Sequence, residues 1–245
     1  MRSPTALEPT DKPAIARRPL SIVGTDTDAG KTVVSTAIAA YWARYREASS
    51  VSLFKPFQSG EGDIERYGEI FGDAIETVNS VYLRDPLAPP VAATNEGVEI
   101  DLGKAWRDLQ SIADRKSHAI VEWLGGLGSP VTWELTVADL VRDWRMSAIL
   151  VAPVRLGSIS QVVACAALAR EAKVNLVGIV LNCVEPTDAV TCEQLMPVGA
   201  IEQLTHLPVL GCVPFLEDAR DRDRLVTVAA DLDIAAIERV GALSS

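Results

Sequence analysis

The residues with the clearest chemical potential form a glycine-containing stretch, GTDTDAGKT, at positions 24–32. Gly24 and Gly30 enclose five residues, whereas the strict pattern of phosphate-binding loops has about four. Backbone N–H groups at a helix start can surround phosphate oxygens, and a lysine followed by a threonine can contact phosphates and Mg²⁺. We therefore predict that Lys31 binds nucleotide phosphates and that Thr32 reaches Mg²⁺. The alternative is an ordinary glycine-containing turn between a strand and a helix.

A second candidate is the lysine of the segment KPFQSG at positions 55–60. The segment follows an apolar run, and open α/β sheets bind ligands at the carboxyl ends of their strands. We expect Lys55 to hold an anion there and Ser59 to add a hydroxyl, unless Lys55 is a surface lysine before a turn. Asp63 follows Ser59 by four residues. Its carboxylate either binds Mg²⁺, directly or by contacting another Mg²⁺ ligand, or is an exposed loop acid.

Further candidates lie at the ends of other apolar segments. Glu122 closes the segment HAIVE, and a carboxylate at such a strand end holds the metal in phosphate-loop enzymes. We predict that Glu122 is an Mg²⁺ ligand rather than an ordinary strand-terminal acid. The segment RLGSIS begins a helix whose start is either capped by Ser158 or Ser160 or binds a carboxylate. Asn182 and the segment 214–216 end two later strands and are placed to border a nucleotide base.

The elements that must position these residues alternate between short apolar runs and longer segments with helical periodicity. The runs are continuous in Val, Ile and Leu, as in strands buried on both faces. The predicted strands are 19–23, 51–54, 118–121, 148–154, 176–181 and 208–213, and the predicted helices are 33–45, 159–172, 195–205 (helical after Pro197) and 221–239. The pattern predicts a single-domain α/β fold with a mostly parallel sheet flanked by helices.

Composition restricts the classes of function. The chain has 245 residues, a formal net charge of −10 and 48% hydrophobic residues, which indicates a globular protein rather than a disordered one. The acidic balance argues against a general nucleic-acid or anionic-membrane binder. The apolar runs are far shorter than the roughly 20 residues of a membrane helix. We expect a cytoplasmic protein.

The ends of the chain and its cysteines add two expectations. Residues 1–18 contain three prolines and no periodicity, so we expect a flexible tail before a domain at 19–245. The four cysteines, at positions 165, 183, 192 and 212, form no C-x-x-C pair. We interpret them as buried thiols of a reduced compartment rather than a disulfide framework or a zinc site. With two histidines in the chain, we expect no histidine-based metal site.

Taken in order, these segments resemble the dethiobiotin synthetase family. The shared features are GTDT-x-x-GKT, K-P-x-x-S-G with a following Asp, V-E-x-x-G-G, R-L-G-x-I, a strand-ending Asn and a late V-P-x-L. The extended spacing between Gly24 and Gly30 is itself typical of that family and of its cobyric-acid-synthase relatives. The resemblance covers roughly residues 19–220.

The resemblance implies an ATP- and Mg²⁺-dependent ligase with a phosphate-loop NTPase-like fold that forms dethiobiotin in biotin biosynthesis. The substrate of the family, 7,8-diaminononanoate, takes up CO₂ as a carbamate, which ATP phosphorylates to a carbamic–phosphoric anhydride. The second amine then closes the ring and releases phosphate. The resemblance also implies a homodimer whose active site lies at the subunit interface.

The same resemblance implies a role for each candidate residue. Lys55 steadies the carbamate and the transferring phosphoryl group, and Lys31 holds the phosphates. Thr27 and Ser59 contact the diamine or the carbamate. The implied Mg²⁺ ligands are Thr32, Asp63 and Glu122. The implied nucleotide contacts in the loop also include Asp28, Ala29, Gly30 and Val33. The implied contacts with the adenine base are Asn182, Pro214, Phe215 and Leu216. Leu156, Gly157, Ser158, Ile159 and Ser160 of a neighbouring subunit hold the substrate carboxylate.

Two positions depart from the family pattern. Trp123 stands where members usually carry glycine after the metal-binding glutamate. If this position requires a positive φ or a close approach to phosphate, the indole would crowd the site. Cys183 stands where an aspartate often follows the base-contacting asparagine, which bears on base selectivity.

Three alternative functions remain at this point. A cobyrinate-type amidoligase shares the phosphate loop but adds a glutaminase domain, for which we expect 245 residues to be too few. A nucleotide-switch ATPase of the partition or metal-chaperone kind typically has an early loop lysine, where this chain has Thr25 and Asp26. A catalytically inactive binding protein is the third alternative. Phosphate release that depends on ATP, bicarbonate and the diamine separates all of them.

Overall fold

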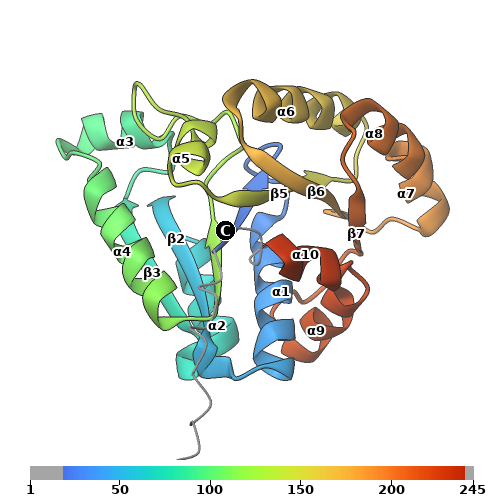
Figure 1. Cartoon of the computed structure of the whole chain (residues 1–245), viewed down its shortest axis with the longest axis horizontal. Helices are drawn as coiled ribbons and strands as arrows, with labels where there is room; N and C mark the ends of the chain where they lie inside the picture. The colour runs from blue at the N-terminus through green and yellow to red at the C-terminus, as the bar shows by residue number, and fades with distance from the viewer. Residues whose placement is uncertain (1–18, 241–245) are drawn as a thin grey trace, which may run out of the picture.

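The computed structural model describes residues 19–240, which fold around one parallel sheet of seven strands (Figure 1). The strand order is β3-β2-β4-β1-β5-β6-β7, and each pair of neighbours is parallel. The strands are β1 (Leu20–Gly24), β2 (Val51–Ser59), β3 (Glu76–Leu83), β4 (His118–Glu122), β5 (Ser147–Pro153), β6 (Asn175–Asn182) and β7 (Val209–Val213). This confirms the predicted α/β fold with a parallel sheet, whereas the expected tail at 1–18 lies outside the described residues.

Helices cover both faces of the sheet because alternate residues of a buried strand point to opposite sides. In β1, Val23 packs in one core cluster and Ile22 in the other. Helices α4, α5, α6 and α8 contribute to the Val23 side, and α1, α2, α9 and α10 to the Ile22 side. The helices are α1 (Lys31–Tyr45), α2 (Asp63–Phe71), α3 (Pro89–Glu96), α4 (Leu102–Arg115), α5 (Val137–Asp143), α6 (Ser158–Ala172), α7 (Ala189–Leu195), α8 (Val198–Thr205), α9 (Arg222–Ala230) and α10 (Ile234–Val240). Within residues 19–240, no helix has the length and apolar character needed to cross a membrane.

The strand β2 is longer than the sequence pattern predicts, and its neighbour β3 has no counterpart among the predicted strands. Pairing with β3 carries β2 onward from Phe54 to Ser59, whose partner is Leu83. Pairing with β4 ends at Phe54, so Pro56, which has no N–H to donate, lies where β2 has one neighbour. Lys55 therefore lies within a buried strand, not in a turn after one. β3 itself is a half-buried edge strand and lacks the continuous apolar run of the inner strands.

The predicted closing helix at 221–239 is two helices, α9 and α10, separated at 231–233. Leu232 turns into the core between them, with 5% of its surface exposed. The backbone N–H of Asp233 donates to the carbonyl of Leu210 at 2.7 Å, and the Asp233 carboxylate accepts from the N–H of Ala236 at 2.9 Å. The amphipathic pattern spans the break because both helices pack on the same face of the sheet.

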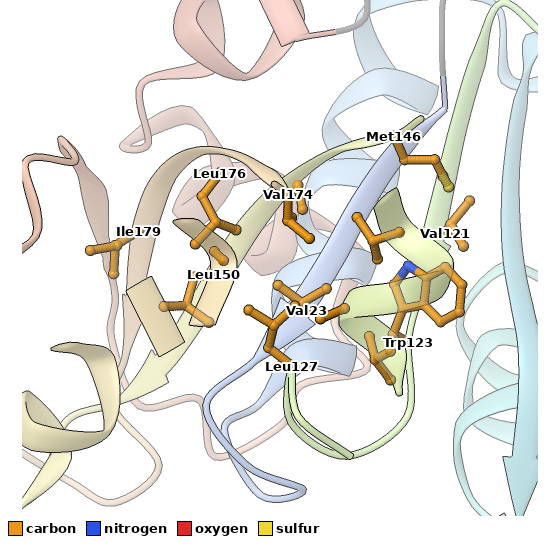
Figure 2. Packing of buried hydrophobic residues seen from close by; sticks show 14 of the residues in the cluster. Val23, Val121, Trp123, Leu127, Met146, Leu150, Val174, Leu176 and Ile179 are labelled. Atoms are coloured by element: carbon orange, nitrogen blue, oxygen red, sulfur yellow. The ribbon is translucent and has the colours of Figure 1, made fainter. Parts of the chain in front are cut away.

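Trp123, the residue that departs from the family pattern, points into the core (Figure 2). Its indole is fully buried beside Val121 and Met146, and its ring centroid lies 5.2 Å from that of Trp144. The indole Nε1 donates to Ser21 Oγ at 3.1 Å. The backbone of Trp123 has no positive φ. The conditions under which this side chain would crowd the phosphate site are therefore not met, because the indole fills the core on the other side of β4.

Candidate active site

The phosphate loop connects the end of β1 to the first residue of α1, as the sequence predicts. Gly30 precedes the helix in the left-handed region, with φ 87° and ψ 28°. A Cβ at this position would lie 2.0 Å from Nδ2 of Asn182, so the loop requires glycine for both conformation and space. The carbonyl of Gly30 accepts from the N–H groups of Val33 and Val34, at 3.1 and 3.2 Å, which forms the first turn of α1.

The loop also folds around the lysine that follows it. Lys31 is 4% exposed, and its Nζ donates to the carbonyls of Asp26 and Thr27 at 2.9 and 3.1 Å. Burial and the neighbouring charge of Lys55 lower the pKa of Lys31 to about 8. Thr27 and Asp28 are exposed and line a cleft beside this lysine, whereas Ala29 is buried. A buried ammonium whose pKa is lowered in this way is well suited to an anionic ligand, which favours its charged form.

Three predicted Mg²⁺ ligands meet at the carboxyl edge of the sheet. Thr32 Oγ1 donates to Asp63 Oδ1 at 2.7 Å and lies 2.8 Å from Glu122 Oε1. These side chains come from the start of α1, the start of α2 and the end of β4. Because β4 lies between β1 and β2, its last residue is next to both loops. The structure thus brings together residues that are separated by 31 and 90 positions in the chain.

Lys55 joins the same group from β2. Its Nζ pairs with Glu122 Oε1 at 3.0 Å and also contacts Asp63, and the side chain is 2% exposed. Burial opposes the charge of Lys55, but the carboxylates of Glu122 and Asp63 outweigh this effect and raise its pKa. For Asp63, burial is outweighed by Lys55 and by the hydroxyl of Thr32, and its pKa is lowered. The alternative of a surface lysine before a turn is wrong.

The oxygen atoms of this group fit a magnesium ion. Mg²⁺ prefers hydroxyl, carboxylate and phosphate oxygens, and usually takes one or two carboxylates from the protein. Asp63 and Glu122 each present such an oxygen within hydrogen-bonding distance of the Thr32 hydroxyl. The ammonium of Lys55 lies against both carboxylates, so the two acids already face a positive charge.

Two residues that the sequence analysis missed hold this group in place. Tyr67 is buried, and its hydroxyl donates to Glu122 Oε2. Burial, followed by the charge of Glu122, raises the pKa of Tyr67, so the phenol stays protonated as a donor. Gln58 accepts from the N–H of Ile64 at 3.0 Å and donates to the carbonyl of Gly60 at 3.1 Å, which fixes the start of α2. The spacing of Tyr67 four residues after Asp63 was a usable signal, because such residues share a helix face.

A cleft of about 720 Å³ opens over these residues. Its lining includes Thr27, Asp28, Gly30, Lys31, Thr32, Val33, Lys55, Ser59, Asp63 and Glu122. The hydroxyl of Ser59 is buried there and has no hydrogen-bond partner in the described structure. Most of the predicted phosphate, metal and substrate contacts therefore share one cavity.

The predicted base contacts lie beside the loop and do not line the cleft. Asn182 ends β6, and its Nδ2 donates to the carbonyl of Ala29 at 3.3 Å. Pro214, Phe215 and Leu216 follow β7, which pairs with β6 at Asn182. We call the ends of these two neighbouring strands the wall; Asn182 is the member that contacts the phosphate loop.

The segment from Leu156 to Ser160 lies apart from the cleft of its own chain. The residue before α6 is Gly157, at φ 92°, and it makes no side-chain cap. Ser158 is the first helical residue and is buried, and Ser160 Oγ donates to the carbonyl of Gly157 at 2.9 Å. A serine N-cap is therefore wrong. Leu156 is 89% exposed and, with Ile159, lines an apolar groove on α6.

Comparison with known proteins agrees with the motifs. An AAA domain family model matches residues 18–222. The ATP-dependent dethiobiotin synthetase BioD of Crocosphaera subtropica is 46% identical over 215 residues, which cover 88% of this chain and 97% of that protein. The BioD of Synechocystis sp. is 44% identical over 218 residues, with 88% and 92% covered.

Solved structures share the fold at much lower identity. A ParA family ATPase from Chlorobium tepidum has a TM-score of 0.55 at 16% identity and covers 93% of this chain and 98% of its own. The MinC:MinD complex of Aquifex aeolicus has a TM-score of 0.56 at 14% identity, with 93% and 97% covered. At such identities the likeness shows the fold alone. Because the 46% and 44% identities extend along nearly all of both BioD proteins, this chain belongs to the ATP-dependent dethiobiotin synthetase family.

Proposed function

We propose that this chain is the ligase that converts 7,8-diaminononanoate, CO₂ and ATP into dethiobiotin, ADP and phosphate. One amine of the substrate takes up CO₂ as a carbamate, and the carbamate oxygen attacks the γ-phosphorus of ATP. The second amine then attacks the carbonyl carbon of the carbamic–phosphoric anhydride, which closes the ring and expels phosphate. The observation that carries the proposal is the Lys55–Asp63–Glu122–Thr32 group beside the phosphate loop, in a chain of this family.

The two lysines supply charge at different points of the phosphoryl transfer. Lys31 lies in the phosphate loop and would hold the β- and γ-phosphates. Lys55 reaches the cleft from β2 and would neutralise the carbamate and the transferring phosphoryl group. Preorganised charge of this kind is effective because it needs no reorganisation during the reaction. Thr27 and Ser59 would contact the diamine or the carbamate, for which the unpaired hydroxyl of Ser59 is available.

Thr32, Asp63 and Glu122 would hold Mg²⁺, which neutralises charge on the phosphate oxygens when it is bound. Tyr67 fixes the orientation of Glu122, and Gln58 fixes the start of α2, where Asp63 lies. The wall formed by Asn182 and residues 214–216 would border the adenine of ATP.

We also propose a homodimer in which the segment Leu156–Ser160 serves the cleft of the neighbouring subunit. The exposed apolar groove beside Leu156 supports this proposal. Leu156→Asp would place a charge in the interface, so light scattering should detect monomers and ring closure should fall. Val98→Asp, which changes an exposed valine elsewhere, should remain dimeric and active. A dimeric Leu156→Asp variant with full activity would remove this role.

The free thiols of this chain agree with a reducing compartment, and we propose that the reaction takes place in the cytoplasm.

The proposed reaction is tested by phosphate release with ATP and Mg²⁺, together with mass spectrometry of the product. Phosphate release should require both the diamine and dissolved CO₂, and the product should have the mass of dethiobiotin. Stimulation by glutamine would favour a cobyrinate-type amidoligase. Stimulation by DNA, with no effect of the diamine, would favour a nucleotide-switch ATPase.

A further inference from the structure

Three cysteines that are distant in sequence come together at one edge of the sheet. Cys183 follows β6, Cys192 lies in α7 and Cys212 lies in the edge strand β7. Cys212 Sγ is 3.8 Å from Cys183 Sγ and 3.6 Å from Cys192 Sγ, and the three sulfurs lie within 4.8 Å of one another. We call this group the tri-cysteine cluster. The expectation of buried thiols holds for Cys183, whereas the other two are half-buried.

The distances from Cys212 Sγ to the other two sulfurs, 3.8 and 3.6 Å, match those between ligands of one metal ion. A zinc–sulfur distance of about 2.3 Å places two thiolates of a tetrahedral site about 3.8 Å apart. A disulfide, by contrast, needs two sulfurs at about 2.05 Å, and here three sulfurs converge. The site is accessible, because Cys192 and Cys212 are half-buried.

We propose that the tri-cysteine cluster binds one thiophilic d¹⁰ cation, Zn²⁺ or Cu⁺, through the sulfurs of Cys183, Cys192 and Cys212. Three sulfur ligands suit a three-coordinate Cu⁺, or a Zn²⁺ whose fourth position is taken by a solvent molecule. Each new metal–sulfur bond replaces an S–H bond, whose proton goes to solvent, and no electrons are transferred.

The chemistry of the pocket favours soft cations over hard ones. Cys183, Cys192 and Cys212 offer sulfur atoms, which are soft ligands that d¹⁰ ions such as Zn²⁺ and Cu⁺ accept and that Mg²⁺ does not. The hydroxyl and carboxylate oxygens of the phosphate site have the opposite preference, so the two sites are expected to select different ions.

The position of the site gives the bound ion a structural role. α7 has no buried residue of its own, and Cys192 would tie it to the edge strand through the ion. Cys183 directly follows Asn182, and Cys212 lies two residues before Pro214. The ion would therefore also hold together the two strand ends that carry Asn182 and residues 214–216. This inference does not depend on the proposed reaction.

The test uses the full-length protein, reduced with a phosphine and freed of metal. Zn²⁺ and Cu⁺ are each titrated in competition with a chromophoric chelator, and native mass spectrometry counts the ions bound per chain. Co²⁺ replaces Zn²⁺ in a parallel sample to reveal sulfur-to-metal charge-transfer absorption. We expect one tightly bound ion per chain, the charge-transfer band, and a higher melting temperature; the two titrations show which of the ions binds more tightly.

Matched serine variants separate a cysteine site from adventitious binding. Cys192→Ser and, independently, Cys212→Ser should weaken binding by more than about 100-fold, since even groups that only orient a ligand are worth about 10–100-fold. Cys165→Ser, which changes a cysteine outside the cluster, should bind as the unaltered protein does. Nucleotide binding by each variant verifies that it is folded. Three results would each overturn the proposal. They are an equal metal affinity in the unaltered protein and in folded Cys192→Ser, metal binding too weak for the chelator competition to detect, and a disulfide in place of a bound ion.

Discussion

The lowered pKa of Lys31 predicts that nucleotide affinity falls as the pH rises through the range just above neutrality. Burial and the charge of Lys55 bring the pKa of Lys31 to about 8 in the free protein. Bound phosphates favour the charged lysine and so raise this pKa again. Binding therefore takes up a proton wherever the free lysine is neutral, and affinity must weaken with rising pH.

The size of the effect follows from the fraction of Lys31 that is charged before binding. With a pKa of about 8, roughly three-quarters of the lysine is charged at about pH 7.5 and about one-eleventh at about pH 9. The Kd for ATP should therefore rise about eightfold between these pH values, or ~1.2 kcal/mol. Lys55 does not contribute, because its pKa is raised and it stays charged. The phosphates of ATP are already ionised in this range, since a phosphate ester loses its second proton at about pH 6.

The assay is calorimetric titration with Mg²⁺ and a non-hydrolysable ATP analogue at constant ionic strength. Titration in two buffers of different ionisation enthalpy should show an uptake of about 0.2 proton per nucleotide at about pH 7.5 and about 0.9 at about pH 9. Lys31→Arg provides the control, because a guanidinium stays charged throughout and should abolish the pH dependence, whatever its absolute affinity. A constant affinity in the unaltered protein, or the same slope in Lys31→Arg, would refute the reasoning.

Two further predictions concern buried side chains next to the site. Tyr67→Phe should lower the free energy of unfolding by about 1–3 kcal/mol in urea titrations, because Glu122 stays buried and loses a hydrogen-bond donor. As a control, Tyr82→Phe changes an exposed tyrosine and should alter the free energy of unfolding by less than about 0.5 kcal/mol. Equal losses of stability in the two variants would remove the structural role of the Tyr67 hydroxyl. Trp123→Ala should cost about 3–5 kcal/mol of unfolding free energy through the cavity it leaves, while ATP affinity in the folded protein stays within about twofold. A large loss of ATP affinity without a loss of stability would place the indole in the site after all.

Local sequence signals predicted the phosphate loop because its requirements are local. The left-handed Gly30, the following Lys31 and the apolar runs on either side lie within a few positions of one another. The inner strands were equally visible, because strands buried on both faces consist of continuous apolar residues. The edge strand β3 is half-buried and more polar, so the same signal does not detect it.

The direction of Trp123 was also readable from the strand, although comparison with the family pattern obscured it. Successive residues of a strand point to opposite faces. Val121 and Trp123 therefore share the core face, and Glu122 between them points to the phosphate loop. The residue after Glu122 can be large because it faces away from the phosphate loop.

Contacts between distant segments could not be predicted from the residues alone. Whether Asp63 and Lys55 reach Glu122 depends on the order of β2, β4 and β1, which no local pattern encodes. For these residues the family resemblance supplied what spacing did not. The tri-cysteine cluster shows the same limit, because its members are separated by up to 29 positions along the chain and meet only where β6, β7 and α7 come together.

The central claim is that Lys55 provides charge to the transferring phosphoryl group while Lys31 holds the nucleotide. The most direct measurement is single-turnover ring closure by Lys55→Ala, together with its affinity for ATP and its free energy of unfolding. We predict a rate about 10²–10³-fold lower, as for other preorganised electrostatic donors, with an ATP affinity within about threefold of the unaltered protein. Lys55→Gln, which keeps most of the length without the charge, should restore little of the rate. Ring closure by folded Lys55→Ala at nearly the unaltered rate would contradict the claim.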